Sequence, residues 1–321
     1  MVQSLKNRDV IMINFIDIEI YLPSNNEKNF YLDKKFKQLP NTFFKKTGVN
    51  NRILSSPNDT AETLACNVAN KIIKKNKIKK LTHIISVTNT PSILFPSVAH
   101  FVRSNLKEFY SQNIHCFGLN AGCSGYVDAL ILASKIIHKN NKSKILIVTS
   151  DTYTKYIDNK DKSILPLFGD GSTATLIEYK KKGWKIEEEF SDTIPNSEKF
   201  LIFKKKKNRY IISMNGPELI SFCLNFVIPK IVYFLKKNKT KKITIYSHQA
   251  SKIVLNLIKK RLKTNFKKVL FPEYYKNIGN LVSSSIPILL KKKMSTFRKS
   301  KNILLCGFGV GLTHSYLKLK K

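Results

Sequence analysis

The chain has 321 residues, 42% of them hydrophobic, and carries 57 lysines and arginines against 21 acidic residues. This length and apolar content suffice for a large core in one tight domain or two fused ones. No run of about 18 apolar residues occurs, so we expect no membrane span. The five cysteines are odd in number and scattered, without CxxC or His/Cys ligand spacing, so we expect neither disulfides nor a metal site.

The formal net charge of +36 admits two interpretations. Lysines occur in short clusters along the whole length, and Asn and Ile are also abundant, which favours a compositional drift toward these residues. A basic face that docks an acidic carrier protein or a phosphate-bearing thioester is the alternative. Nucleic acid ranks last among the partners of such a surface, and we expect none.

Residues 1–9 are charged and polar and precede a short strand-like run. They lack the basic, then apolar, then small-residue pattern of a secretory signal. We therefore expect a cytoplasmic protein with reduced thiols.

In chain order, β-branched apolar runs alternate with helical patterns. The runs predict strands at 10–21, 79–87, 114–119, 144–149, 241–247 and 302–307. The helical patterns cover 59–75, 126–138, 216–236, 251–264 and 281–292. This alternation is typical of α/β layers with mostly parallel sheets.

The two halves of the chain echo each other. The segment 79–87 is similar to 241–247, and 144–149 is similar to 302–307. We therefore expect a duplicated unit, with one half at 1–178 and the other at 179–321. A hairpin-like segment at 178–208 lies near the break.

Cys123 stands in the run GLNAGCSGY, residues 118–126, where a predicted strand turns into a helix. Small residues let the backbone pass through such a crowded turn. Unpaired N–H groups and the positive end of the helix dipole favour a thiolate there. A buried packing cysteine is the alternative interpretation of this segment alone.

Three further segments lie at predicted strand ends. His248 follows the strand in YSHQAS, residues 246–251, and Asn280 follows a glycine in NIGN, residues 277–280. Alternating glycines at 307, 309 and 311 allow close backbone approach. Because ligands of α/β sheets gather at the carboxyl ends of strands, these segments predict a site.

Together these motifs resemble those of the β-ketoacyl-acyl-carrier-protein synthase III family, within the thiolase-like superfamily. AGCSG around Cys123 resembles the nucleophile motif, SHQA around His248 the HQAN motif, and GN at Asn280 with the following serines the GNTS motif. The segments 47–52, 167–172 and 307–311 resemble the family's TGIxxR, FGDGA and terminal glycine loop. The matches are collinear and cover nearly the whole chain.

The resemblance implies a duplicated five-layered α-β-α-β-α fold, a homodimer, and a site between the two halves. It implies that Cys123 is the acyl-accepting nucleophile and that His248 and Asn280 bind the thioester carbonyl of a malonyl unit. It further implies an oxyanion hole formed by the N–H groups of Cys123 and Gly309. Phe95 matches the position that reaches across the dimer and shapes the acyl pocket.

The activity implied is acyl loading on Cys123 followed by decarboxylative condensation with malonyl-acyl-carrier protein, which initiates fatty-acid synthesis. The substrates would be coenzyme A or carrier-protein thioesters, with no cofactor and no metal. An acyltransferase that moves the acyl group to a hydroxyl or amine of a specialised product, with His248 as general base, is one alternative. A non-catalytic partner subunit is another. Asn280 favours condensation, and the intact Cys123 and His248 argue against the inactive subunit.

The chain departs from the family pattern at the expected substrate-binding residues. Thr42 replaces a tryptophan that stacks on adenine, and Lys46 and Lys162 replace two arginines, whereas Arg52 is retained. Lysine keeps attraction for phosphate but loses the planar contact. The replacements therefore point to carrier-bound or unusual acyl donors besides acetyl-coenzyme A. The HQAN motif ends in Ser251, and Asp170 in FGDG is expected to brace a turn.

Overall fold

The computed structural model describes residues 10–207, 209–237, 242–266 and 268–321. Residues 1–9, in which we looked for a secretory signal, lie outside the described residues. Ten described strands form one mixed sheet in the order β12-β11-β13-β14-β8-β1-β7-β6-β4-β5. They are β1 (Met12–Tyr21), β4 (His83–Val87), β5 (His115–Leu119), β6 (Lys144–Asp151), β7 (Gly171–Glu178), β8 (Trp184–Thr193), β11 (Ile243–Ser247), β12 (Val269–Leu270), β13 (Asn302–Phe308) and β14 (Thr313–Lys320).

The sheet consists of two half-sheets with the same internal arrangement. In the first, β4 lies parallel between β5 and β6, and β7 and β1 follow antiparallel. In the second, β11 lies parallel between β12 and β13, and β14 and β8 follow antiparallel. Among the described residues, the half-sheets join at the edge between β1 and β8, where Met12 pairs with Lys185 and Ile13 with Trp184. We infer that two repeats meet between the end of β7 at Glu178 and the start of β8 at Trp184.

Two expectations about the strands were wrong. The sheet is only partly parallel, because apolar runs indicate buried strands without indicating their direction. The segment 178–208 is not a hairpin, since β8 belongs to the large sheet and Asn208 lies outside the described residues. The hairpin begins inside this segment, where β9 (Leu201–Lys206) pairs with β10 (Arg209–Met214) beyond its end.

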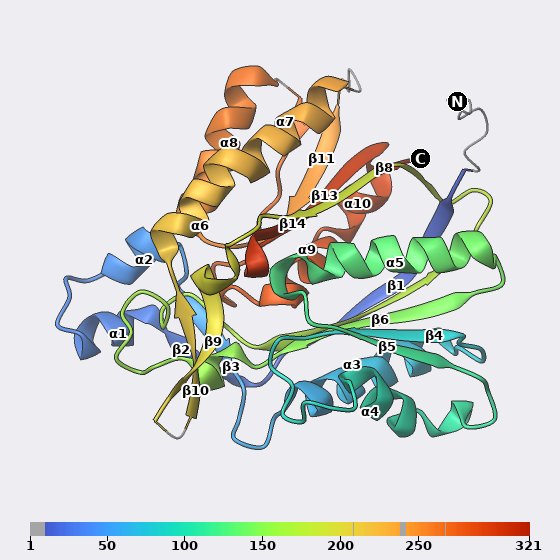
Figure 1. Cartoon of the computed structure of the whole chain (residues 1–321), viewed down its shortest axis with the longest axis horizontal. Coiled ribbons are helices and arrows are strands. Elements are labelled where there is room, and N and C mark those ends of the chain that lie inside the picture. Colours follow the sequence, from blue (N-terminus) through green and yellow to red (C-terminus); the bar gives the residue numbers. More distant parts are fainter. Residues whose placement is uncertain (1–9, 208, 238–241, 267) are drawn as a thin grey trace.

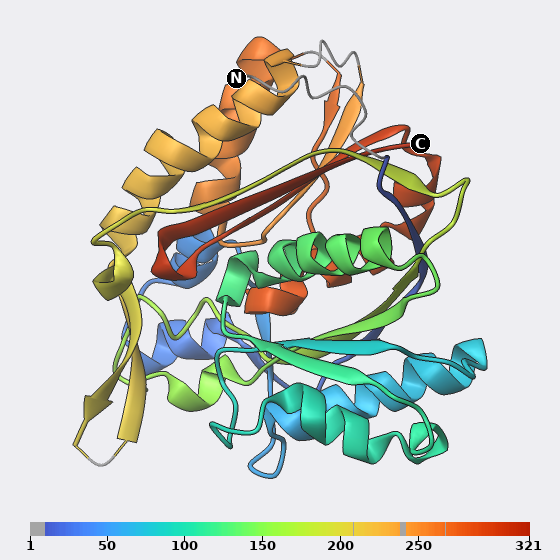
Figure 2. The same cartoon turned by 45° about the vertical axis from the view of Figure 1, so that its right-hand side comes forward.

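The helices complete five layers, as expected. α3 (Ala61–Asn76) and α4 (Val98–Asn105) pack on the outer face of the first half-sheet. α5 (Gly125–Lys139) and α9 (Ser285–Lys292) lie between the half-sheets, and α7 (Ile228–Lys237) and α8 (Lys252–Asn265) cover the outer face of the second (Figures 1 and 2). The other described α-helices and strands are α1 (Asn29–Lys35), α2 (Thr42–Thr47), α6 (Gly216–Phe222), α10 (Met294–Lys299), β2 (Asn25–Lys28) and β3 (Asn51–Leu54).

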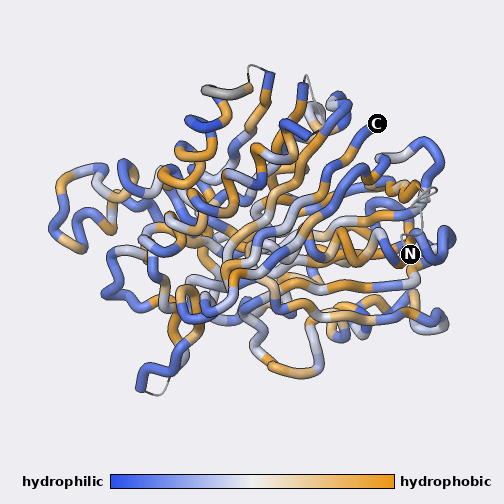
Figure 3. The backbone as a smooth tube through the Cα atoms, turned by 45° about the horizontal axis from the view of Figure 1, so that its top comes forward, coloured by the Kyte–Doolittle hydropathy of each residue, from blue (hydrophilic) through white to orange (hydrophobic). Residues whose placement is uncertain are grey.

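The central helix α5 shows how the sequence determines the layers. Tyr126, Leu130, Ala133 and Ile137 recur at helical spacing, and all are buried. They join strand residues of both half-sheets in one central core cluster. The inner strands β4, β6, β11 and β13 are mostly apolar and buried, because helices cover both of their faces. Figure 3 shows hydrophobic segments along the central strands and hydrophilic ones at the turn of the β9–β10 hairpin.

Helix boundaries agree with the predicted patterns except at two places. The pattern at 281–292 begins as a 3-10 turn, η6 (Val282–Ser284), because Val282 has a left-handed φ of 49°. The pattern at 216–236 is α6 and α7 joined by a π-helical turn, η5 (Cys223–Val227). This combined helix, Gly216–Lys237, is long and apolar enough by composition to cross a membrane. Its inner face packs into the core of the second half, so length and composition alone do not show a membrane span.

We predict that Leu130→Ala lowers the free energy of unfolding by about 2–5 kcal/mol, because it opens a cavity in the central layer. Urea denaturation measures the loss. The matched control is Leu39→Ala, at a leucine that is 80% exposed, which should change stability by less than about 0.5 kcal/mol. Equal losses in the two variants would contradict the assigned core.

Candidate active site

The turn that carries Cys123 connects β5 to α5 through a short 3-10 helix, η2 (Gly122–Ser124). Gly122 has a φ of +50°, and a Cβ atom there would lie 2.3 Å from Asn89 Oδ1. Only glycine fits both the conformation and the space. Cys123 itself is buried at the end of this turn.

The terminal glycine loop of the second half lies directly against this turn. A Cβ atom at Gly309 would lie 3.0 Å from Cys123 Sγ, and one at Gly307 would lie 2.8 Å from Ser124 Cα. The glycines therefore allow the end of β13 and the loop after it to approach Cys123 closely.

His248 follows the last residue of β11, and its backbone N–H donates to Cys306 O at 2.8 Å. Its Nδ1 lies 2.7 Å from Ser285 Oγ. The Ser285 hydroxyl has one hydrogen, which it donates to Val282 O at 2.9 Å, so it accepts from Nδ1–H. We infer that the neutral imidazole carries its proton on Nδ1 and leaves the Nε2 lone pair free for chemistry.

Asn280 is fixed by backbone bonds to the first half. Its N–H donates to Leu167 O at 2.9 Å, and its carbonyl accepts from Gly169 N–H at 3.0 Å. Asn280 Nδ2 donates to Ala250 O at 3.2 Å and lies 3.5 Å from His248 Nε2. The carboxamide thus stands beside the imidazole with its orientation set by these bonds.

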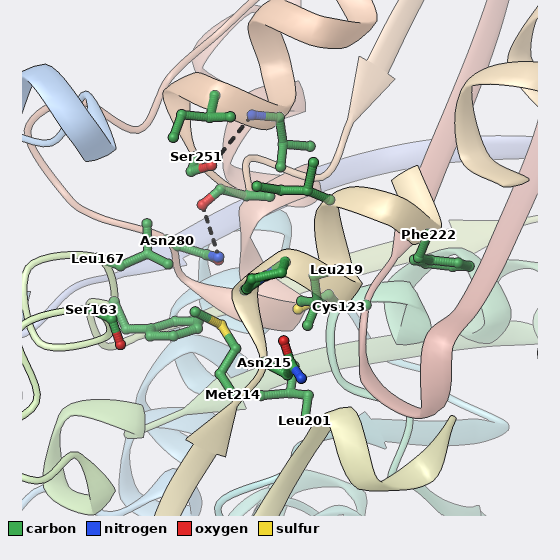
Figure 4. A pocket seen from close by; sticks show the side chains of 18 of the residues that line it. Cys123, Ser163, Leu167, Leu201, Met214, Asn215, Leu219, Phe222, Ser251 and Asn280 are labelled. Atoms are coloured by element: carbon green, nitrogen blue, oxygen red, sulfur yellow. Dashed lines mark hydrogen bonds between the residues drawn. The ribbon is translucent and has the colours of Figure 1, made fainter. Parts of the chain in front are cut away.

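The structure brings Cys123, His248 and Asn280 to one cavity of about 680 Å³. Figure 4 shows Cys123 and Asn280 facing the same space, with Met214 and Leu219 beside it. The apolar part of the lining includes Leu167, Phe168, Leu201, Met214, Leu219, Phe222 and Val254. The exposed side chains Lys46 and Lys199 also border the cavity. The apolar walls suit an uncharged, chain-like ligand, and the two lysines suit anionic groups at the end of that ligand that remains outside the cavity.

The thiol and the imidazole are both neutral at neutral pH. Burial raises the pKa of the Cys123 thiol far above its usual value, and the charge of Asp151 raises it further. The helix end does not outweigh these effects, so the expected stable thiolate was wrong. Burial also lowers the pKa of His248 to about 3. A neutral imidazole can take the proton of a neutral thiol as the sulfur attacks.

The predicted oxyanion donor Gly309 needs a correction. Its N–H donates to Thr313 O at 3.0 Å, because it closes the turn between β13 and β14. The next N–H, of Val310 at the start of η7 (Val310–Leu312), has no hydrogen-bond partner among the described residues. Val310 packs in the same cluster as Cys123. The register of the final turn, which the sequence does not show, decides which of the two N–H groups is free.

The expected substrate-binding residues do not lie together in the structure. Lys46 borders the cavity, whereas Lys162 is exposed with its Nζ 5.6 Å from the Phe36 ring centre. Arg52 is buried and paired with Glu27, away from the cavity lining, so its assignment to substrate binding was wrong. Phe95 is 84% exposed and does not line the cavity of its own chain.

Two other motif residues have structural roles. Asp170 is buried and accepts hydrogen bonds from the backbone and hydroxyl groups of Ser55 and Thr154, which confirms that it braces a turn. Ser251 accepts from Val254 N–H at 3.4 Å and caps α8 (Figure 4). Serine and asparagine are both good N-caps, so the departure from HQAN preserves this function.

Comparisons with known proteins point to one family. The sequence profile of 3-oxoacyl-[acyl-carrier-protein] synthase III matches residues 117–193, and the profile of its C-terminal part matches residues 237–320. The β-ketoacyl-[acyl-carrier-protein] synthase III of Streptococcus mutans is 30% identical over 320 residues, covering 94% of this chain and 96% of that relative. The synthase III of Clostridium perfringens is 28% identical and covers 93% and 96%.

Solved structures show the same fold. The 3-oxoacyl-(acyl carrier protein) synthase III of Pseudomonas aeruginosa has a TM-score of 0.83 at 20% identity, over 96% of this chain and 98% of that chain. The priming β-ketosynthase of the R1128 polyketide pathway has a TM-score of 0.85 at 18% identity, over 99% and 98%. The expected thiolase-like, duplicated five-layered fold is confirmed.

The low pKa of His248 predicts a pH-dependent stability. An unfolded histidine titrates near 6.5 and the folded one near 3, so the unfolded chain binds more protons between these values. Stability present above pH ~6.5 is therefore lost as the pH falls toward ~3. We expect the free energy of unfolding of His248→Asn to fall less between pH 7 and pH 4 than that of the wild type. Urea denaturation at both pH values measures this, and equal losses would contradict the buried neutral imidazole.

Proposed function

This chain belongs to the 3-oxoacyl-[acyl-carrier-protein] synthase III family of condensing enzymes, and we propose that it uses Cys123, His248 and Asn280 as its catalytic residues. It loads an acyl group on the Cys123 sulfur and joins it to malonyl-acyl-carrier protein with loss of carbon dioxide, which initiates fatty-acid synthesis. One observation supports this assignment most. A buried thiol from one half and an imidazole and a carboxamide from the other line one largely apolar cavity.

The first step is acyl transfer. The Cys123 thiol gives its proton to His248 Nε2 as the sulfur attacks the thioester carbonyl. The resulting oxyanion accepts hydrogen bonds from the N–H groups of Cys123 and Val310, each worth roughly 2.7–4 kcal/mol in related chemistry. The carbon–sulfur bond of the donor then breaks, and the departing thiolate takes the proton from the imidazolium.

The second step needs donors at the carbonyl of the malonyl thioester. Asn280 Nδ2 supplies one. His248 supplies the other once the Ser285 hydroxyl donates to Nδ1 and the proton resides on Nε2. Carbon dioxide leaves, the enolate oxygen accepts these two bonds, and the enolate carbon attacks the acyl thioester on Cys123. The carbon–sulfur bond to Cys123 breaks, and the thiolate takes one proton from solvent, which is the proton that the overall reaction consumes.

The cavity suits the arm of a coenzyme A or carrier-protein thioester. Its apolar walls accept the chain, and Lys46 and Lys199 lie where phosphate groups would remain in solvent. No step of this chemistry requires a metal or a further cofactor. The enzyme needs a reduced Cys123, which the cytoplasm supplies.

We further propose that the enzyme acts as a homodimer. The loop 91–97 exposes Ile93, Leu94 and Phe95, and Ser97 of the same loop packs on Gly118 of β5. β5 is an edge strand of the large sheet. An exposed apolar loop beside an unpaired edge is typical of a protein interface. In a second copy, Phe95 would close the acyl pocket of its partner.

Acyl loading gives the direct test of the proposed function. After incubation with a panel of acyl-coenzyme A and acyl-carrier donors, intact-protein mass spectrometry should show the added acyl mass on the wild type and not on Cys123→Ala. Cys66→Ala, at a half-buried thiol outside the cavity, is the matched control and should still be loaded.

A radiolabelled acyl group should then pass to a ketoacyl product when malonyl-acyl-carrier protein is added. Transfer of the label to an alcohol or amine would replace condensation by plain acyl transfer. Absence of loading with every donor would contradict an acyl-enzyme mechanism.

The dimer proposal predicts a second result. Phe95→Ala should lower the fraction of dimer in size-exclusion chromatography with light scattering, and it should broaden the range of acyl chains loaded on Cys123. Leu39→Ala, at an exposed apolar residue outside the loop 91–97, should change neither the dimer fraction nor the range of acyl chains. A wild-type protein that is monomeric at all concentrations would contradict the proposal.

A further inference from the structure

One buried carboxyl group beside the nucleophile takes no part in the chemistry above. Asp151 is the last residue of β6, and its side chain is fully buried. It accepts hydrogen bonds from Asn89 N–H at 2.8 Å, from the Thr88 and Thr90 hydroxyls at 3.2 and 3.3 Å, and from the Ser283 hydroxyl. Burying a charge is costly unless such bonds offset the lost hydration, so this site is built around the carboxylate.

These bonds connect the two halves of the molecule. Asn89 follows β4 in the half that carries Cys123. Ser283 belongs to η6 in the other half, three residues after Asn280. Asp151 therefore joins the turn that presents the carboxamide to the strand ends beneath the nucleophile.

Asn89 extends this connection to the nucleophile turn. Its Oδ1 lies where a Cβ atom of Gly122 would be, and it accepts from the Tyr153 hydroxyl at 3.1 Å. Its Nδ2 donates to Asn120 Oδ1, three residues before Cys123. A displacement of Asp151 would thus move both sides of the site.

The charge of Asp151 also acts on the nucleophile. Cys123 and Tyr153 are the titratable groups whose pKa values this charge raises, and His248 faces Cys123 from the other half across the shared cavity. Burial raises the pKa of Asp151 itself to about 6, against the hydrogen bonds that lower it. The carboxyl group is therefore mostly ionised at neutral pH.

We propose that Asp151 is a positioning residue: its hydrogen bonds hold the Asn280 turn against the Cys123 turn. This inference rests on the proposed condensing function, because the position of Asn280 is read out in the malonyl step.

The test compares Asp151→Asn, which replaces one acceptor oxygen of the carboxylate by an amide nitrogen, with Ser283→Ala, which removes the hydroxyl that donates to Asp151 from the Asn280 side. Asp170→Asn, at a buried carboxyl bonded to Ser55 and Thr154 instead, is the matched control.

The readout is the rate of condensation relative to the rate of acyl loading. This ratio should fall about tenfold or more in Asp151→Asn and also fall in Ser283→Ala, because misplacing Asn280 affects the malonyl step most. It should stay at the wild-type value in Asp170→Asn. An unchanged ratio in both Asp151→Asn and Ser283→Ala would overturn the positioning effect. A wild type that loads but never condenses would refute the proposed function instead.

Discussion

The short backbone bridge between Asn280 and the Phe168 segment is the contact on which the site depends. Two hydrogen bonds, Asn280 N–H to Leu167 and Gly169 N–H to Asn280, attach a turn of the second half to a loop of the first. Gly279 makes this possible, because it has a φ of +83° and a Cβ atom there would lie 2.9 Å from Gly169 N. The central core cluster packs the two halves together, and the bridge at Asn280 sets their position at the site.

The site works with neutral groups held out of water. A thiol and an imidazole that are both uncharged need no counter-ions, and the cavity walls can remain apolar. Charge develops only during the reaction, when the proposed oxyanion donors, the N–H groups of Cys123 and Val310, would stabilise it. The buried carboxylate of Asp151 accepts hydrogen bonds from two chain segments, residues 88–90 and Ser283, and does not line the cavity.

Much of this arrangement could be predicted from the sequence. The runs at 79–87 and 241–247 indicated equivalent strands, and the small residues around Cys123 indicated a crowded turn, because side-chain size and branching act locally. Strand direction, the tautomer of His248 and the free N–H of Val310 could not be predicted, since each depends on a partner far along the chain. Arg52 shows the same limit. It lies in the segment that resembles TGIxxR, but its burial beside Glu27, which rules out the expected contact with substrate, depends on the fold.

The position of the Cys123 sulfur, which we propose as the nucleophile, has a consequence for covalent inhibitors. Cys123 is buried and borders the cavity, and its thiol is protonated at neutral pH because burial raises its pKa. A covalent inhibitor would therefore approach the sulfur through the cavity. A bulky electrophile that modifies exposed thiols would not reach it. An effective compound would need a slender apolar shape and a carbonyl group that the proposed oxyanion donors can polarise. Its selectivity would then come from its shape more than from the reactivity of its electrophilic group.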